Sequence, residues 1–479
     1  MNEIEGSESV SKGGTAKGRS TFSGKMGFVL AAAASAVGLG NLWRFPYLAA
    51  KYGGGLFLVV YFILVVTFGF ALLVAEIALG RRTRLSAIGA FSYYGKKYRF
   101  IGILASAVPF LITPYYAVIG GWVTKYMAAY FVDPASEIAS DGYFVSFITS
   151  TGIDTYIWAF IFLALTFLVI ALGVKNGIEK SNRVIMPVLI VLMIAVSVFS
   201  LLQPGALEGL AYYVVPDFSK LSFELLVAAM GQMFFSLSLA MGIMITYGSY
   251  FKREENLEKS VRRIEVFDTG IAFLAGLMII PACFAVTGNG AEIAGNAGPS
   301  LMFVILPQIF AEFGTWGNVV GAAFFILVLF AALTSCISLM ETCVSIVSDG
   351  LKCSRRKAIW INVVFMFVVA TLCNMGYNVW SGVDPMYTLF GIGSLGDHQI
   401  LDFMDFLSNT VLMPIVSFLT CIFVGYVIKP KEIEDEVEQG GVKFKSRKLF
   451  VVMIKYIAPV FVVLILVGYL LMAWGVLNL

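Results

Sequence analysis

Long apolar runs recur along almost the whole chain of 479 residues, and they limit its fold more than any other feature. A helix that spans a bilayer needs about 20 consecutive apolar residues. Runs such as that from Leu56 to Leu79 do not alternate between polar and apolar residues, as the strands of a membrane barrel would. Only 13% of the residues are charged, where soluble domains have about 25%. We therefore predict an all-α polytopic membrane protein.

Eleven transmembrane helices are expected between the charged or turn-rich breaks. They are 26–48, 55–80, 100–131, 153–172, 183–203, 223–250, 264–288, 317–347, 358–376, 403–428 and 449–476. An odd number of spans puts the two termini on opposite sides of the membrane.

Basic residues predict which side is which, because Lys and Arg that flank spans tend to stay in the cytoplasm. They gather in the N-terminal tail and in alternate connections, namely 81–99, 175–183, 252–263, 352–357 and 429–448. We expect a cytoplasmic N-terminus, an external C-terminus and a bacterial inner-membrane location. The net charge of +3 reflects this bias and gives no reason to expect a nucleic-acid partner.

The first span contains a segment that a good membrane helix would avoid, SAVGLGNLWRFP (35–46). Gly costs about 1 kcal/mol against Ala in a helix, and an Arg within the membrane costs at least ~2.5 kcal/mol. Unwinding near Ser35 to Gly40 would free backbone carbonyls, which are tolerated only where protein, ions or a water-filled cavity satisfy them. The expected break therefore predicts a binding site.

The sixth span repeats the theme with GQMFFSLSLAMG (231–242), which puts Gln232, Ser236 and Ser238 into an apolar helix. Interrupted helices at matching positions of two five-helix halves are typical of inverted-repeat transporters with a site at the membrane midplane. Each small residue alone is explained as well by close helix packing. The expected division of the chain is a tail at 1–22, repeats at 23–203 and 204–428, and a connection with the last helix at 429–479.

Several motifs carry a resemblance to a known family: GLGNLWRFP (38–46), KYGGGLF (51–57), AEIALGR (75–81), PYYAVIGGW (114–122), GQMFFSLSLAMG, ITYGSY (245–250), LTSCIS (333–338) and DFMDF (402–406). The sequence resembles the bacterial neurotransmitter:sodium symporters, which have the leucine-transporter fold with broken helices 1 and 6. The resemblance implies Na⁺-coupled symport of a neutral amino acid by alternating access. It implies Na⁺ as coupling ion, two per cycle, and no other cofactor.

The resemblance also implies two sodium sites. The first consists of the substrate carboxylate with the Ala36 carbonyl, the Asn41 amide oxygen, Ser236 and Asp268. The second consists of the carbonyls of Ala34, Val37 and Ala331 and the hydroxyls of Thr334 and Ser335. Hard oxygen ligands suit Na⁺. Without the motif on the first span, Thr334 and Ser335 would be read as hydroxyls bonded back to their own helix.

Asp268 stands where animal members of the family have an amide and use chloride to balance the sodium charge. Its carboxylate can supply that charge, so we expect chloride independence. Ala272, one turn later, supplies none. By hydropathy alone, Asp268 could instead be a solvated helix end.

The substrate site implied by the resemblance holds the carboxylate near Gly38, Gly40 and Tyr116. Monoamine carriers have an aspartate at the position of Gly38, so a substrate with its own carboxylate is expected. The whole set is Ser35, Ala36, Gly38, Gly40, Ile112, Tyr116, Phe235, Ser236, Ser238, Met241, Met244, Ser335, Cys336, Ser338 and Leu339. This mainly apolar set best fits a hydrophobic side chain. Ala240 replaces a Gly common in bacterial relatives and leaves the accepted size open.

Two charge pairs resemble the family's gates: Arg44 with Asp405 outside, over a lid of Tyr116 and Phe235, and Arg19 with Asp349 inside. A pair that forms and breaks suits alternating access. Arg19 and Asp349 are also readable as ordinary charges of the cytoplasmic face. Glu76 resembles the family's buried glutamate that braces the break in the sixth span.

Other functions fit the sequence less well. The same machinery could carry another small carboxylate-bearing amine or osmolyte. An amino-acid sensor that does not transport would need a signalling domain or a long docking tail, and the longest cytoplasmic connection is only 429–448. An enzyme is not expected, because no nucleophile, base and orienting group occur with motif spacing. The expected partners are the amino acid, Na⁺ and the bilayer.

Overall fold

The structure is a computed structural model that describes residues 21–288, 295, 298–396, 398–439 and 441–475. Helices make up most of these residues, and the only β-pairing among them is an isolated bridge between Gly54 and Pro216. The all-α prediction is confirmed.

The helices of the expected spans carry most of the structure. They are α1 (Lys25–Ala36) with η1 (Gly40–Arg44) and α2 (Phe45–Lys51); α3 (Gly55–Leu64), η2 (Val65–Gly69) and α4 (Phe70–Thr83); η3 (Lys96–Tyr98) and α6 (Arg99–Val132); α9 (Asp154–Ala171); η4 (Val174–Glu179) and α10 (Lys180–Leu201); α12 (Phe223–Ser236) and α13 (Ile243–Tyr250); α14 (Leu257–Thr287); η7 (Gly314–Trp316) and α17 (Gly317–Gly350); α18 (Arg355–Met375); α20 (Ile400–Asp405), η8 (Phe406–Leu412), α21 (Met413–Ile422) and η9 (Phe423–Val427); and α23 (Arg447–Val452), η10 (Met453–Ile457) and α24 (Ala458–Ala473).

Short helices form the connections. They are α5 (Ala87–Ser92), α7 (Ala135–Ile138), α8 (Tyr143–Ile148), α11 (Ala206–Val214), η5 (Phe218–Lys220), η6 (Leu301–Ile305), α16 (Leu306–Ala311), α19 (Pro385–Phe390) and α22 (Pro430–Val437).

Nine continuous helices among the described residues are long and apolar enough to cross a membrane, and the bent pair formed by residues 25–36 and 40–51 makes a tenth. The expected sixth span consists of α12 and α13, and neither is long enough to cross alone. The number eleven therefore stays a prediction. The expected breaks in spans 1 and 6 are both present.

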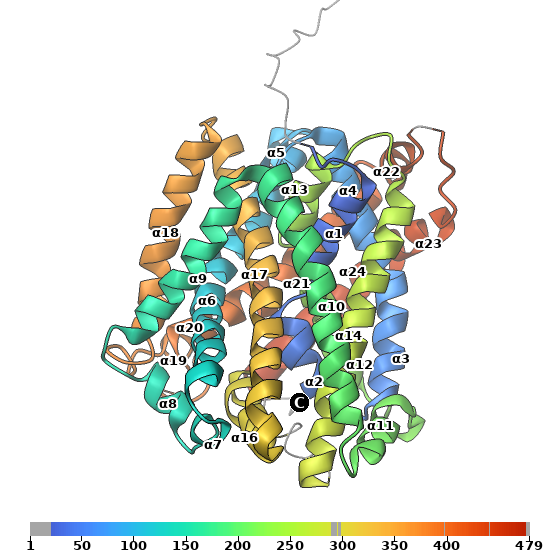
Figure 1. Ribbon diagram of the computed structural model, residues 1–479. Helices are drawn as coiled ribbons and strands as arrows, with labels where there is room; N and C mark the ends of the chain where they lie inside the picture. Colours follow the sequence, from blue (N-terminus) through green and yellow to red (C-terminus); the bar gives the residue numbers. More distant parts are fainter. Residues whose placement is uncertain (1–20, 289–294, 296–297, 397, 440, 476–479) are drawn as a thin grey trace, which may run out of the picture.

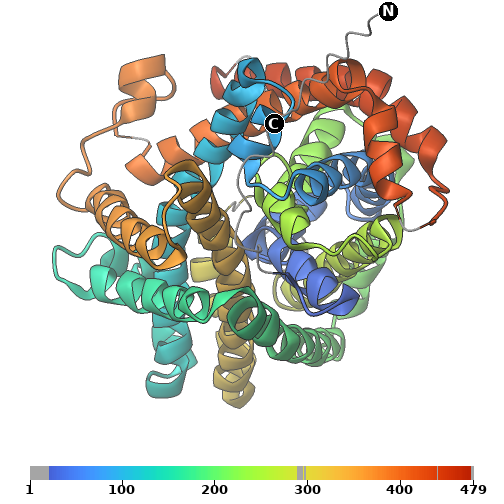
Figure 2. The ribbon, with the colours of Figure 1, turned by 90° about the horizontal axis from the view of Figure 1, so that it is seen from above.

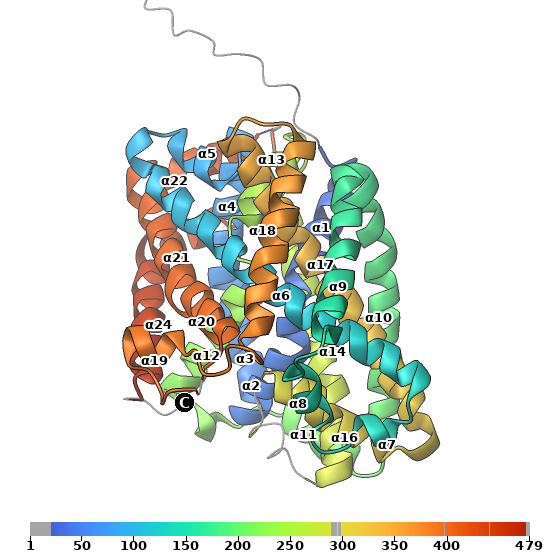
Figure 3. The same cartoon turned by 90° about the vertical axis from the view of Figure 1, so that its left-hand side faces the viewer.

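The connections sort to two ends of the bundle. In Figure 1, α5, α13 and α22 lie at the upper end, whereas α7, α8, α11, α16 and α19 lie at the lower end, and Figure 3 shows the same division from the side. The basic connections 81–99 and 429–448, which hold α5 and α22, thus share one end, as the alternation of spans requires.

The broken helix α1 lies in the interior. Figure 2 shows α9 and α18 at one edge, the last helices at the opposite edge and α1 between them. Residues 31–34 of α1 are four consecutive alanines without solvent exposure, and α1 packs against α14 and α17. Small side chains allow the close approach of helix backbones that membrane proteins depend on for packing. The Ala-rich sequence therefore suits α1 to a position surrounded by other helices.

Several spans contain π-helical turns, including η1, η2, η4, η8 and η9. A π-helical turn shifts the following side chains around the helix axis, and such turns are frequent at functional sites. In the first span, η1 follows the break directly. The sequence pattern did not predict these turns.

Candidate functional site

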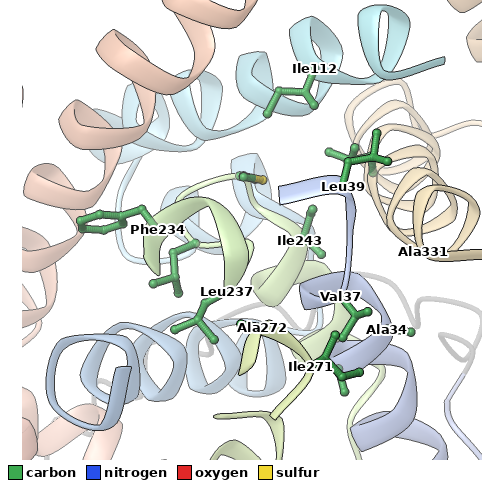
Figure 4. Packing of buried hydrophobic residues seen from close by; sticks show 14 of the residues in the cluster. Ala34, Val37, Leu39, Ile112, Phe234, Leu237, Ile243, Ile271, Ala272 and Ala331 are labelled. Atoms are coloured by element: carbon green, nitrogen blue, oxygen red, sulfur yellow. The ribbon is translucent and has the colours of Figure 1, made fainter. Parts of the chain in front are cut away.

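The break in the first span exposes backbone carbonyls to other helices. The last helical bond of α1 runs from the Val37 nitrogen to the Ala33 carbonyl at 2.8 Å, and the two halves of the span are bent by 53°. The freed Ser35 carbonyl accepts hydrogen bonds from Ser238 at 3.1 Å and from Ser335 at 3.2 Å. Figure 4 shows Val37 and Leu39 at this break, with Ile243 of α13 nearby. Polar groups from spans 6 and 8 thus satisfy the carbonyl, as expected for a break in a membrane.

The break in the sixth span holds residues in the left-handed backbone region. The φ angles of Ser238 and Ala240 are 53° and 61°. This conformation costs roughly 1–2 kcal/mol for a residue with a side chain and persists only where the surroundings impose it. The carboxylate of the buried Glu76 accepts a hydrogen bond from the Ala240 nitrogen at 2.7 Å. Glu76 therefore braces the break through the backbone nitrogen of Ala240, the residue that replaces a Gly common in bacterial relatives.

One cluster of oxygen atoms joins the end of α1 to the middle of α17. The Val37 carbonyl accepts hydrogen bonds from Thr334 at 3.4 Å and from Ser335 at 3.2 Å, and Thr334 also donates to the Ala331 carbonyl at 3.0 Å. Four of the five residues expected for the second sodium site are thus joined. The fifth, Ala34, is buried near the end of α1 (Figure 4).

A second cluster surrounds Asp268 of α14. The Asn41 amide nitrogen donates to Ser236 at 2.9 Å and to Asp268 at 3.0 Å, and the Ser236 hydroxyl also donates to Asp268. Tyr61 donates to the other carboxylate oxygen at 2.7 Å. Asp268 has no solvent exposure, so it is not a solvated helix end. Spans 1, 2, 6 and 7 meet at this carboxylate.

The Asn41 side chain is turned differently from the sequence-based expectation. Its amide nitrogen faces Asp268, whereas its oxygen accepts a hydrogen bond from the Gly38 nitrogen at 3.2 Å. Only the NH₂ side of an amide can donate to a carboxylate. A rotation of the amide by 180° would turn the oxygen towards Asp268 and Ser236, as a cation ligand requires.

A small cavity of about 30 Å³ lies between the two breaks. Its lining residues are Ser35, Ala36, Gly38, Gly40, Asn41, Ile112, Tyr116, Phe235, Ser236, Ser238, Met241, Ile243, Ser335 and Leu339. Most of the residues expected to bind substrate are among them. None of the described lining residues is charged.

Three residues expected to bind substrate do not line this cavity: Met244, Cys336 and Ser338. All three are buried, and Ser338 accepts a hydrogen bond from Tyr247 at 2.8 Å. Ile243 lines the cavity and was not expected. The unwound stretch sets where α13 begins and therefore which of its side chains face the cavity, and the sequence contains no local signal for that rotation.

Gly38 lies where a side chain has no room. A Cβ atom at this position would be 2.5 Å from the Ser335 hydroxyl and 3.0 Å from the Tyr116 hydroxyl. Tyr116 also accepts a hydrogen bond from the Leu39 nitrogen at 3.2 Å. Backbone N–H groups of the break and the Tyr116 hydroxyl therefore converge on one end of the cavity, where they could bind a carboxylate.

A larger cavity of about 270 Å³, which we call the vestibule, adjoins the small one. Tyr116 and Phe235 line both cavities and so lie between them. Arg44 and Asp405 also line the vestibule. The expected lid residues thus separate the small cavity from the vestibule that carries the expected gate charges.

Arg44 and Asp405 face the same vestibule, but among the ion pairs of the described residues they do not form one. Arg44 donates to the Tyr469 hydroxyl at 3.3 Å. Asp405 accepts hydrogen bonds from Tyr115 at 2.8 Å and from Asn409 at 2.6 Å. Each charge of the expected gate has partners of its own in this conformation.

The second expected gate is only partly visible. Arg19 lies outside the described residues. Asp349 accepts a hydrogen bond from the Ser86 nitrogen at 2.8 Å, at the start of α5. Tyr61 and Tyr469 were not singled out from the sequence, because each lies more than 200 residues from its partner and no local pattern marks the contact.

Similarity to known proteins extends over most of the chain. A family model described as the sodium:neurotransmitter symporter family matches residues 19–139 and 145–474. The uncharacterized sodium-dependent transporter YhdH of Bacillus subtilis is 35% identical over 424 residues, which cover 88% of this chain and 90% of that protein. An uncharacterized sodium-dependent transporter of Haemophilus influenzae is 32% identical over 473 residues, which cover 95% of this chain and 99% of that protein.

A solved structure is also similar over nearly the whole chain. The crystal structure of MhsT in complex with L-phenylalanine matches with a TM-score of 0.82 and 34% identity. The match covers 94% of this chain and 100% of that chain.

Proposed function

This chain belongs to the sodium:neurotransmitter symporter family, and on that premise we propose that it couples the uptake of a neutral, hydrophobic amino acid to two Na⁺ ions. It is a multi-pass, sodium-dependent transporter with the leucine-transporter fold, and not an enzyme. The substrate, the number of ions, the side of each terminus and the residue roles given below are our proposals.

The observation that carries the proposal is the pair of buried oxygen clusters at the two breaks. One centres on Asp268 with Asn41 and Ser236, and the other on the Val37 carbonyl with Thr334 and Ser335. Neutral oxygen ligands and one carboxylate suit Na⁺, which is held by hard oxygen donors. Each cluster joins separate helices, so an ion bound there would favour one arrangement of those helices over another.

In our proposal the first ion is bound by Asp268, Ser236, the Asn41 oxygen, the Ala36 carbonyl and the substrate carboxylate. The second is bound by Thr334, Ser335 and the carbonyls of Ala34, Val37 and Ala331. The substrate completes the first site, and this shared ligand makes binding of the substrate and of the ion interdependent.

The chemistry of the small cavity supports a neutral amino acid. Ile112, Met241, Ile243 and Leu339 offer apolar surface for the substrate side chain. A charged side chain would lose its hydration in a cavity whose described lining contains no opposite charge. The carboxylate would be bound at Tyr116 and the backbone of Gly38, and the ammonium by carbonyls of the two breaks. The solved complex of MhsT contains L-phenylalanine, and its similarity to this chain supports a hydrophobic substrate.

We further propose that transport does not need chloride. The buried Asp268 carboxylate lies beside Asn41 and Ser236, where it would balance the charge of the first ion directly. A mobile anion is then not needed for electroneutrality of the site.

Alternating access would move spans 1, 2, 6 and 7 against spans 3, 4, 8 and 9. We propose repeat boundaries at 23–203 and 204–428, a cytoplasmic N-terminus and an external C-terminus. The distribution of basic residues supports this orientation. The vestibule would then open to the outside, and Arg44 and Asp405 would close it over the lid of Tyr116 and Phe235.

Binding to the purified protein tests the substrate proposal. A panel of radiolabelled amino acids, including charged, β- and γ-amino acids, is measured in NaCl, sodium gluconate and choline chloride. We expect saturable binding of one or more hydrophobic amino acids in both sodium buffers and none in choline. Binding restricted to charged or to β- and γ-amino acids would overturn the substrate class, and binding that needs chloride would overturn chloride independence.

A further inference from the structure

The last membrane helix, α24, forms part of the vestibule wall through Ile465 and Tyr469. α24 lies outside the two proposed repeats, 23–203 and 204–428, so alternating access of the repeats does not explain what this helix does. We infer that Tyr469 is a positioning residue that holds Arg44 away from Asp405 and so keeps the vestibule open. The inference rests on the proposed gating role of Arg44 and Asp405.

Arg44 is held by groups on its own side of the vestibule. Its guanidinium group donates to the Tyr469 hydroxyl at 3.3 Å and lies 5.9 Å from the centroid of the Phe235 ring. Phe235 belongs to α12, and α12 packs against α24. The guanidinium plane has five fixed N–H donors, so a hydroxyl in its plane restrains its direction as well as its position.

Gly231 of α12 leaves the space through which the Tyr469 side chain reaches Arg44. A Cβ atom on Gly231 would overlap the Tyr469 hydroxyl and ring, at a separation that real Cβ contacts do not reach. Both residues line the vestibule. The Tyr469–Arg44 contact therefore requires that residue 231 has no side chain. Gly231 and Tyr469 act together to position Arg44.

Asp405 is restrained on the other side of the vestibule. Tyr115 donates to its carboxylate at 2.8 Å and Asn409 donates at 2.6 Å. For the two gate charges to meet, Arg44 has to exchange the neutral Tyr469 hydroxyl for the Asp405 carboxylate. A hydrogen bond between two opposite charges is stronger than one in which only the donor is charged. The Tyr469 contact opposes that exchange, and its loss shifts the balance towards the closed gate.

Thiol labelling of the vestibule measures this balance without any substrate. Thr410 lines the vestibule and is partly exposed, so Thr410→Cys provides the reporter. Five native cysteines are buried, and the partly exposed Cys353 is replaced by Ser in the background. The purified protein in Na⁺ buffer is treated with a charged thiol reagent. We expect Tyr469→Phe to slow labelling about three- to tenfold, the factor that corresponds to one lost hydrogen bond.

Two further variants separate positioning from a general structural effect. Tyr456→Phe makes the same chemical change in η10 of the last span, on an exposed side chain, and should leave the labelling rate unchanged. Gly231→Ala displaces the Tyr469 side chain and should slow labelling as Tyr469→Phe does. It also covers the case in which Tyr469→Phe does not fold.

The decisive comparison is made in Asp405→Asn. This background lacks the charge that competes with Tyr469 for Arg44, so the effect of Tyr469→Phe should vanish there. Labelling that is unchanged or faster in both Tyr469→Phe and Gly231→Ala would overturn the inference, as would an equal slowing in Asp405→Asn. Uptake assays keep the two proposals apart. Na⁺-coupled uptake with unaltered labelling rejects only the role of Tyr469, whereas altered labelling without amino-acid uptake rejects only the proposed transport.

Discussion

The Asp268 carboxylate accepts a hydrogen bond from the Asn41 amide at 3.0 Å, which joins span 7 to the break in span 1. The two residues lie 227 positions apart in the sequence. A cation bound between them would require Asn41 to turn its oxygen inward and give up its bond to the Gly38 nitrogen. Ion binding and the backbone of the substrate site are therefore linked through a single side chain.

Chloride replacement tests the role of the carboxylate. Uptake by the wild-type protein should be equal, within about twofold, in chloride and in gluconate, because Asp268 itself neutralises the ion. Asp268→Asn should raise the Na⁺ concentration for half-maximal binding by about tenfold or more, since it removes that charge. Na⁺ titrations in both anions provide the measurement. Wild-type transport that stops without chloride would contradict this account.

Ser335→Ala tests the second oxygen cluster. Ser335 donates to the carbonyls of Ser35 and Val37, each at 3.2 Å, and is a proposed ligand. Its loss should raise the half-saturating Na⁺ concentration roughly ten- to hundredfold, the cost of one bond to a charged group. Thr342→Ala, two turns further along α17, removes a buried hydroxyl bonded to its own helix and serves as control. Equal Na⁺ curves for both variants and the wild type would exclude Ser335 as a ligand.

The strained backbone at Ala240 predicts a stabilising substitution. Its φ of 61° is unfavourable for Ala, and Glu76 bonds only its backbone nitrogen, which Gly retains. Ala240→Gly should therefore raise the free energy of unfolding by up to about 1 kcal/mol, which is measured as a higher thermal midpoint in detergent. Ala71→Gly in the regular helix α4 should lower it by about 0.5–1 kcal/mol. A lower midpoint for Ala240→Gly would show that the left-handed conformation carries no strain.

Two neighbouring arginines at the end of α4 predict unequal contributions to stability. Arg81 and Glu436 form an ion pair at 2.7 Å with neither side chain exposed, whereas Arg82 and Glu432 are 28% and 27% exposed. Arg81→Ala should lower the free energy of unfolding by about 3–5 kcal/mol, because it leaves Glu436 buried without its main partner. Arg82→Ala should cost less than about 1 kcal/mol.

Denaturation of the matched variants in detergent compares the two pairs. Replacing both members of the buried pair by apolar residues, Arg81→Met with Glu436→Leu, should cost less than Arg81→Ala alone. If Arg81→Ala and Arg82→Ala have the same effect, the buried pair does not hold α22 against α4.

The sequence was sufficient to predict the breaks, because Gly, Asn and Arg are costly inside a membrane helix and stand out from their apolar neighbours. Gly38 and Asn41 mark the first break in this way. Gln232, Ser236 and Ser238 located the second break. Its strained residues include Ala240, and the conformational preference of Ala does not predict a left-handed backbone there.

Contacts between distant helices were harder to predict. Met244 was expected in the cavity, but the length of the unwound stretch rotates α13 so that Ile243 lines it instead. Cys336 and Ser338 of α17 were also expected there and do not line it. Such rotations depend on tertiary packing and not on periodicity. The partners of Arg44 and Asp405 also depend on tertiary packing. The resemblance to the family implied a direct pair, whereas phenol and amide groups from spans 3, 10 and 11 bind these two charges in this conformation.

Uptake into proteoliposomes tests the central claim most directly. The purified protein is reconstituted, and uptake of the labelled amino acid found in the binding assay is followed with an inward Na⁺ gradient or with K⁺ on both sides. We predict accumulation above the external concentration only with the Na⁺ gradient, and its loss in Asp268→Ala and Ser335→Ala but not in Thr342→Ala. Equal uptake without Na⁺, or Na⁺-dependent binding without any accumulation, would contradict coupled symport.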